Sequence, residues 1–168
     1  MSLTLSTKYY LQALEAYPYD LAETMESLDY ALSYDSKHAG VHCLMGQLYM
    51  EQTKQFDKAE HHFEQALICD INHLVTYELY SLLLIELGEF KRAKKLVKHA
   101  YTLKGASVCK LKHREALILE RKGKYTRSRE ILTEAYDLGF NNSDREFLKN
   151  ELDRLKEKVK ANKKRKSR

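Results

Sequence analysis

Several features that mark other classes of protein are scarce in this sequence of 168 residues. One Pro and six Gly are too few for the many turns of an all-β domain. The longest strongly apolar run, residues 82–85, is far shorter than the roughly 20 residues that span a bilayer. Three cysteines at wide, unequal spacing do not have the pattern of a disulfide framework. These absences favour a helical protein with reduced thiols, and no transmembrane segment is expected.

The N-terminal residues lack the basic and apolar regions of a secretory signal peptide. We therefore expect a cytoplasmic protein, or a nuclear one if the organism is a eukaryote.

Hydrophobic residues make up 43% of the chain and charged residues 32%, a balance typical of a folded domain and not of a disordered chain. The length suits one domain or one row of repeats.

Charge is distributed unevenly along the chain. Residues 1–73 contain four basic and eleven acidic residues, residues 74–155 contain 17 and 12, and residues 156–168 contain eight and one. The formal net charge of +5 therefore combines an acidic front, a basic back half and a strongly basic end. A partner that binds through charge is therefore expected at one of these regions and not over the whole chain.

The sequence repeats itself with a period of 34 or 35 residues. Phe56, Phe90 and Tyr125 each begin the same pattern, with a small residue three positions later, a large apolar residue after seven and Ala after ten. A weaker copy begins at Leu21. Because these positions fall on one face of an α-helix, each copy predicts an amphipathic helix, and a similar helix precedes it.

Each copy therefore predicts an antiparallel pair of helices joined by a short turn. Gly88 and Gly123 stand where the chain needs a positive φ at a helix end. Small residues are expected to let the paired helices approach closely. The expected pairs are Gly46 with Ala59, Ser81 with Ala93, and Ala116 with Ser128.

This pattern resembles the tetratricopeptide repeat family. The match is best in residues 39–73, through Gly46, Tyr49, Ala59, Phe63 and Ala66. The next repeat carries it through Tyr77, Gly88, Phe90, Ala93 and Ala100, and the third through Ala116, Gly123, Tyr125 and Ala135. The resemblance implies an all-α fold, a right-handed superhelix or solenoid of antiparallel helix pairs. Its parts are expected at 1–38 (a degenerate pair), 39–73, 74–108 and 109–142 (repeats), 143–160 (a capping helix) and 161–168 (a basic, disordered tail).

The capping helix is predicted from two local patterns. Ser143 and Glu146 have the spacing of a capping box, which begins a helix. A narrow apolar stripe follows, suited to covering the open face of the last repeat. The alternative is a short coiled-coil seam for dimerisation, so a monomer or a weak dimer is compatible with the sequence. The stripe consists of Leu148, Leu152, Leu155 and Val159.

No catalytic or cofactor motif is present. A phosphate-binding glycine loop, a nucleophile elbow and an H-E-x-x-H zinc motif are all lacking, so we predict a protein that is not an enzyme and has no cofactor. His38, His42 and Cys43 have spacing compatible with metal binding, but no second ligand pair follows them. We therefore predict no metal site.

The resemblance implies an adaptor or scaffold that binds a partner protein or peptide in a concave groove lined by the first helix of each pair. Lys110 and Arg114 match the last pair of the carboxylate clamp that some members possess, whereas Cys43, Gln47 and Leu79 occupy the other clamp positions. The partner is therefore expected to have an apolar centre and an acidic end. The predicted groove residues are Cys43, Gln47, Met50, Val75, Glu78, Leu82, Ile85, Lys110, His113, Arg114 and Leu117.

Two other functions fit the sequence. A secretion-type chaperone or a co-chaperone is compatible with the same groove. Polyanion binding is possible through the basic tail, whose densest run is Lys163, Lys164, Arg165 and Lys166, which in a eukaryote has the composition of a nuclear import signal. Because no aromatic side chain interrupts that run, base stacking is lacking and nucleic acid is the weaker alternative.

Overall fold

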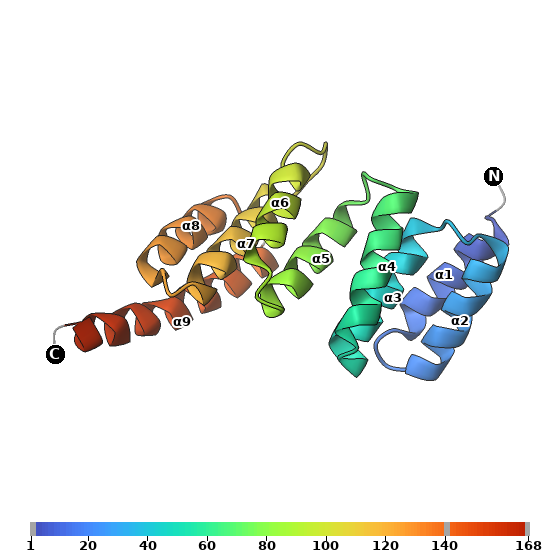
Figure 1. Cartoon of the computed structure of the whole chain (residues 1–168), viewed down its shortest axis with the longest axis horizontal. Coiled ribbons are helices and arrows are strands. Elements are labelled where there is room, and N and C mark those ends of the chain that lie inside the picture. The colour runs from blue at the N-terminus through green and yellow to red at the C-terminus, as the bar shows by residue number, and fades with distance from the viewer. Residues whose placement is uncertain (1–2, 140–141, 167–168) are drawn as a thin grey trace. The chain divides into compact units, whose positions relative to one another are not determined.

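The computed structural model describes residues 3–139 and 142–166, and it describes side chains up to residue 162. Within these residues the chain forms nine α-helices and one π-helical segment and contains no strand (Figure 1). The predicted all-α fold is confirmed. The chain divides into two compact units, residues 1–83 and 84–168. None of the described helices is both long enough and apolar enough to span a membrane.

The first unit contains two antiparallel helix pairs (Figure 1). Asp20 begins the second helix, because its carboxylate accepts a hydrogen bond from the backbone N–H of Glu23 at 2.9 Å. The core between the pairs consists of Ala13, Leu28, Ala31, Val41, Leu44 and Met45. The helices are α1 (Leu5–Ala16), α2 (Leu21–Tyr34), α3 (Ala39–Leu48) and α4 (Phe56–Cys69), followed by α5 (Leu74–Glu86), which contains the boundary between the units.

The turn before the second helix of a repeat has a left-handed residue at one fixed position. Gly88 and Gly123 have φ values of 78° and 72°, which confirms the prediction. Lys54 occupies the equivalent place two residues before Phe56, and its φ is 55°. The turn at Lys54 follows a π-helical segment, Tyr49–Thr53, that the sequence pattern does not predict.

Close packing of the paired helices involves small residues. A Cβ atom on Gly46 would lie 2.7 Å from a ring carbon of Phe63, so Gly46 makes room for this buried ring on α4. The expected approach of Ala116 and Ser128 is confirmed, because the Ser128 hydroxyl donates to the Ala116 carbonyl at 2.6 Å. In these two hairpins, α3–α4 and α7–α8, a small residue thus allows the helices to lie close together.

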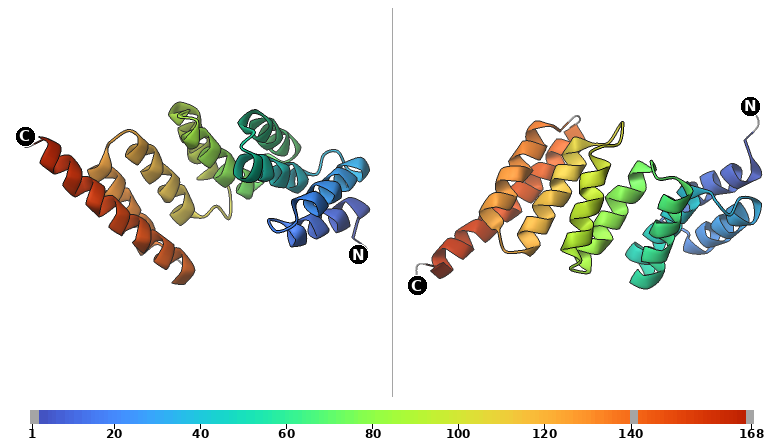
Figure 2. Two further views of the ribbon diagram at one scale, coloured as in Figure 1. Left: turned by 90° about the horizontal axis from the view of Figure 1, so that it is seen from below. Right: turned by 45° about the horizontal axis from the view of Figure 1, so that its top comes forward.

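The second unit contains α6 (Phe90–Ala100), α7 (Val108–Arg121), α8 (Tyr125–Asp137) and α9 (Asn142–Lys166). Figure 2 shows α7 and α8 as a hairpin, with α9 packed against it. The predicted apolar stripe of α9 enters the core here, since Leu148 and Leu155 are buried and Leu152 is half-buried. The rest of this core consists of Cys109, Ala116, Leu132 and Ala135.

Both ends of α9 differ from the prediction. The helix begins at Asn142, so Ser143 lies inside it and is not its N-terminal cap. It continues to Lys166, so residues 161–166 are helical although a disordered tail was expected there. Lys and Glu are good helix formers, and Lys160 pairs with Glu157 at 2.9 Å, which supports this extension. Residues 167 and 168 lie outside the described part of the chain.

We predict that Lys54→Gly stabilises the protein. A left-handed conformation costs a residue with a side chain roughly 1–2 kcal/mol, and Gly avoids this cost but loses part of the gain through the entropy of the unfolded chain. The free energy of unfolding should rise by about 0.5–1 kcal/mol in urea denaturation. Lys54→Ala is the control, because it removes the charge and keeps the Cβ atom. An equal gain in both variants would contradict the explanation.

Candidate partner-binding surface

The predicted groove residues of the first unit lie partly in its interior. Cys43 and Met50 are buried, and burial raises the pKa of the Cys43 thiol to about 11. Met50 belongs to the π-helical segment, where an α-helical count of positions no longer gives the correct face. Gln47 is half-buried, and its amide donates to the Glu51 carboxylate at 3.1 Å.

On α5, three predicted groove residues retain a surface. Val75 is exposed, whereas Glu78 and Leu82 are half-buried. Ile85 is buried, contrary to the prediction. This helix is apolar on nearly every side, so its sequence does not distinguish a face for a partner from a face for the core.

In the second unit three of the four predicted groove residues, Lys110, Arg114 and Leu117, lie on a strip of α7 that Arg121, which was not predicted, continues. Lys110 and Arg121 are exposed, and Arg114 and Leu117 are half-buried. Their spacing of four, three and four residues places them on one face of the helix. We call this strip, together with the part of α9 beside it, the α7–α9 surface.

His113 is buried, with 8% of its surface exposed, and does not line the surface. Its Nδ1 atom accepts a hydrogen bond from the Arg114 guanidinium at 2.9 Å, and its ring contacts Phe147 of α9 edge to face, at 5.1 Å between centroids. Its Nε2 atom lies 3.9 Å from the Glu151 carboxylate. Burial, and then the charge of Arg114, lower the pKa of His113 to about 4. The neutral imidazole of His113 therefore lies beneath the surface and holds the Arg114 guanidinium in place.

Glu120 connects α7 to α9 through ion pairs. Its carboxylate accepts hydrogen bonds from Arg154 at 2.7 Å and from Lys158 at 2.6 Å. Burial alone would raise its pKa, but these two partners lower it to about 2. Arg154 also donates to Glu151 at 2.6 Å. Glu120 is therefore an anion at neutral pH and orients two cations that remain partly exposed.

A pocket of about 380 Å³ opens on this surface. Three basic side chains share it with one buried carboxylate, so its accessible groups are mainly positive. Of the lining residues only Leu117 is predicted from the sequence, although Arg121 continues the spacing of Lys110, Arg114 and Leu117. The lining residues are Leu117, Glu120, Arg121, Tyr125, Arg154 and Lys158.

The histidines near the N-terminal repeats make local contacts. His38 accepts a hydrogen bond from the Val41 backbone and thereby caps α3. The Nδ1 atoms of His42 and His62 lie 3.1 Å apart, and burial lowers the pKa of His62 to about 4. Among the described residues, no three His, Cys, Asp or Glu side chains are arranged to hold a metal ion.

Comparison with known proteins relates this architecture to others. A family model for the tetratricopeptide repeat matches residues 39–67. The crystal structure of a tetratricopeptide repeat protein from Parabacteroides merdae ATCC 43184 is similar to this chain, with a TM-score of 0.66 and 20% sequence identity. The similarity covers 94% of this chain and 62% of the other. A comparison with curated proteins gave no match.

Antiparallel helix pairs with a period of 34 or 35 residues define an α-helical repeat protein. The family match identifies residues 39–67 as a tetratricopeptide repeat, and the structural similarity shows that the chain has the fold of such a repeat protein, as its sequence predicts.

We predict that His113 makes stability depend on pH. Its pKa is about 4 in the folded protein, whereas the ordinary value for a histidine is 6.5, so folding favours the neutral ring. The contribution of neutral His113 to the free energy of unfolding is complete above pH 6.5. It is lost as the pH falls towards 4, and the loss is about 2 kcal/mol at pH 4.5. The thermal midpoint of His113→Gln should therefore fall less between pH 7 and 4.5 than that of the wild type.

The thermal midpoint of His62→Gln should also fall less with pH than that of the wild type, because burial lowers the pKa of His62 as well. His99→Gln, which replaces an exposed histidine of α6, is the control for the substitution itself. If the thermal midpoint of His113→Gln fell as far between pH 7 and 4.5 as that of the wild type, the assignment of a neutral, buried imidazole would be contradicted.

Proposed function

We propose that this protein is an adaptor that binds an acidic segment of a partner protein on the α7–α9 surface. The helical repeat fold supports protein interaction in general. The observation that supports this particular site is the pocket in which Arg121, Arg154 and Lys158 converge. Binding and not catalysis is the proposed activity.

The site is organised before the partner arrives. Glu120 holds the charged groups of Arg154 and Lys158, and His113 holds that of Arg114. Because these side chains are already ordered, a ligand loses less binding free energy to their immobilisation. Arg154 still exposes 39% of its side chain and Lys158 exposes 46%, so both can donate hydrogen bonds to a further carboxylate.

The dimensions of the strip indicate the length of the ligand. Lys110 and Arg121 are eleven residues apart, or about 16 Å along a helix. An extended segment of about five residues covers that distance. Leu117 and Tyr125 offer apolar contacts within it, so the segment should combine carboxylates with one or two apolar side chains.

Polyanion binding by the basic end of α9 is the alternative function. Lys163, Lys164, Arg165 and Lys166 lie on the last turns of the helix, and their side chains are outside the described part of the chain. Removing residues 161–168 leaves the pocket residues in place, so this deletion separates the two functions.

The test is a fluorescence anisotropy titration with a labelled peptide that contains four Asp residues and one Leu. Lys110→Glu combined with Arg121→Glu should weaken binding at least about tenfold, because two attractive charges become repulsive. Lys149→Glu combined with Lys156→Glu is the matched control, since both residues are exposed on α9 and do not line the pocket.

Equal weakening in the two double variants would contradict the proposed site. Loss of binding on deletion of residues 161–168, with wild-type affinity in Lys110→Glu/Arg121→Glu, would instead support the polyanion alternative. The same variants can be used as baits in affinity purification with mass spectrometry to identify the partner, including a chaperone or a chaperone substrate.

A further inference from the structure

We propose a second binding site on the opposite face of α7, where α6, α7 and α8 form a groove that accepts an acidic segment with aliphatic side chains. This proposal goes beyond the adaptor function on the α7–α9 surface. Glu115, Ile118, Leu119 and Lys122 of α7 line the groove, whereas Leu117, Glu120 and Arg121 line the other pocket. At 3.6 residues per turn these two sets point in opposite directions.

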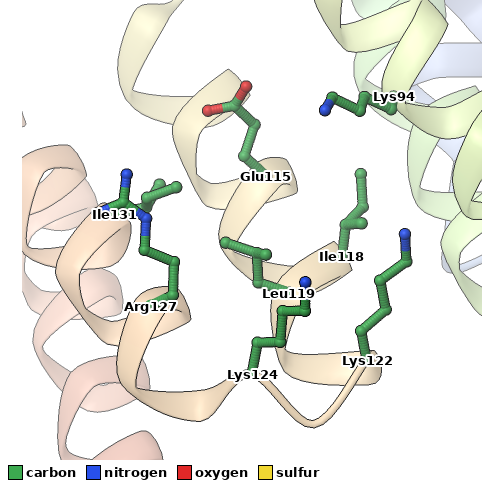
Figure 3. A pocket seen from close by; sticks show the side chains of 8 residues that line it. All are labelled: Lys94, Glu115, Ile118, Leu119, Lys122, Lys124, Arg127 and Ile131. Atoms are coloured by element: carbon green, nitrogen blue, oxygen red, sulfur yellow. The ribbon is translucent and has the colours of Figure 1, made fainter.

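The groove has a volume of about 300 Å³, enough for a few side chains of a partner. Figure 3 shows Lys94 of α6 at one edge, Arg127 and Ile131 of α8 at the other, and Leu119 of α7 between them. All its lining residues belong to the second unit. The complete lining consists of Lys94, Glu115, Ile118, Leu119, Lys122, Lys124, Arg127 and Ile131.

The charge of the groove indicates the charge of its ligand. Four of the eight lining residues are basic and one is acidic. That acidic residue, Glu115, accepts a hydrogen bond from the Tyr101 hydroxyl at 3.4 Å. Arg127 is oriented by an exposed pair with Glu130 at 2.8 Å, and the Lys122 ammonium lies 5.4 Å from the centre of the Phe90 ring. A ligand with several carboxylates complements this rim.

The surface next to the groove extends the positive field. Five basic residues and no acidic residue occur in α6, and all five are exposed. Such a concentration of one sign of charge raises the association rate of an oppositely charged partner. The residues are Lys91, Arg92, Lys94, Lys95 and Lys98.

The floor of the groove distinguishes a protein ligand from a nucleic acid. Ile118 is 6% exposed, and Leu119 and Ile131 are half-buried, so the floor is aliphatic. None of the eight lining residues is aromatic, so the groove provides no ring on which a base could stack. Leu or Ile side chains of a partner would instead remove this aliphatic surface from water. The ligand is therefore a protein segment in which Asp or Glu residues flank Leu or Ile.

The test uses three labelled probes in anisotropy titrations: a 12-residue peptide of Glu and Leu, the same peptide with Ser in place of each Leu, and a 12-nucleotide single-stranded DNA. The leucine peptide should bind at least about tenfold more tightly than the serine peptide, because two or more buried side chains contribute apolar area. It should also retain more binding in 0.5 M salt, since salt screens charge and not apolar contact.

The groove variant is Lys94→Glu combined with Lys124→Glu, in which both original side chains are exposed and come from opposite walls. It should bind the leucine peptide at least about tenfold more weakly than the wild type. Lys95→Glu combined with Lys149→Glu has the same change in net charge outside the groove and should lose less than about threefold. Circular dichroism and thermal midpoints verify that all variants fold.

Equal losses in the two double variants would overturn the proposal, because net charge alone would then explain binding. Equal affinity for the leucine and serine peptides, or tighter binding of the DNA, would also overturn it. In a Lys110→Glu/Arg121→Glu background, which removes the α7–α9 surface as a competing site, Lys94→Glu/Lys124→Glu should still weaken binding of the leucine peptide at least about tenfold. Complete loss of that binding in Lys110→Glu/Arg121→Glu alone would place the peptide on the α7–α9 surface and overturn the second site, whereas failure of the adaptor test leaves this result unaffected.

Discussion

Close approach of the two helices in each hairpin is the constraint on which the structure depends. Gly46 provides it in one pair, where even a methyl group would meet the Phe63 ring, and Ser128 provides it in another by bonding directly to the Ala116 backbone. The buried apolar residues can then form a dense core, since helices held further apart would leave voids between them. That packing also positions the polar faces of the helices and the side chains that would contact the proposed ligands.

Ion pairs between distant parts of the sequence form the charged surface of the second unit. The long separation in sequence between Glu120 and its partners, 34 residues to Arg154 and 38 to Lys158, means that folding assembles the cationic pocket. A buried carboxylate requires such partners, because an isolated charge in the interior is costly. The same ion pairs thus join α9 to α7 and position basic groups at the surface. Structure and proposed binding share one set of interactions.

Helix pairs and turns could be predicted because they depend on local spacing, and so could the common helix face of Lys110, Arg114 and Leu117. The positive φ at Gly88 and Gly123 follows from a glycine that stands in the turn two residues before a predicted helix. Met50 and Ile85 could not be placed correctly, because one lies in a π-helical segment and the other in a helix that is apolar all round. The pocket contacts of Arg154 and Lys158 depend on the docking of α9, which no short-range pattern encodes.

The helical form of the C-terminal basic segment changes its linear charge density. Residues 156–166 contain seven basic residues and one acidic residue. As a helix these eleven residues extend about 16 Å, whereas an extended chain of the same length would cover about 36 Å. The positive charge per unit length is therefore roughly doubled, and more counterions must accompany it. Coil formation at this end would disperse that charge without changing its amount.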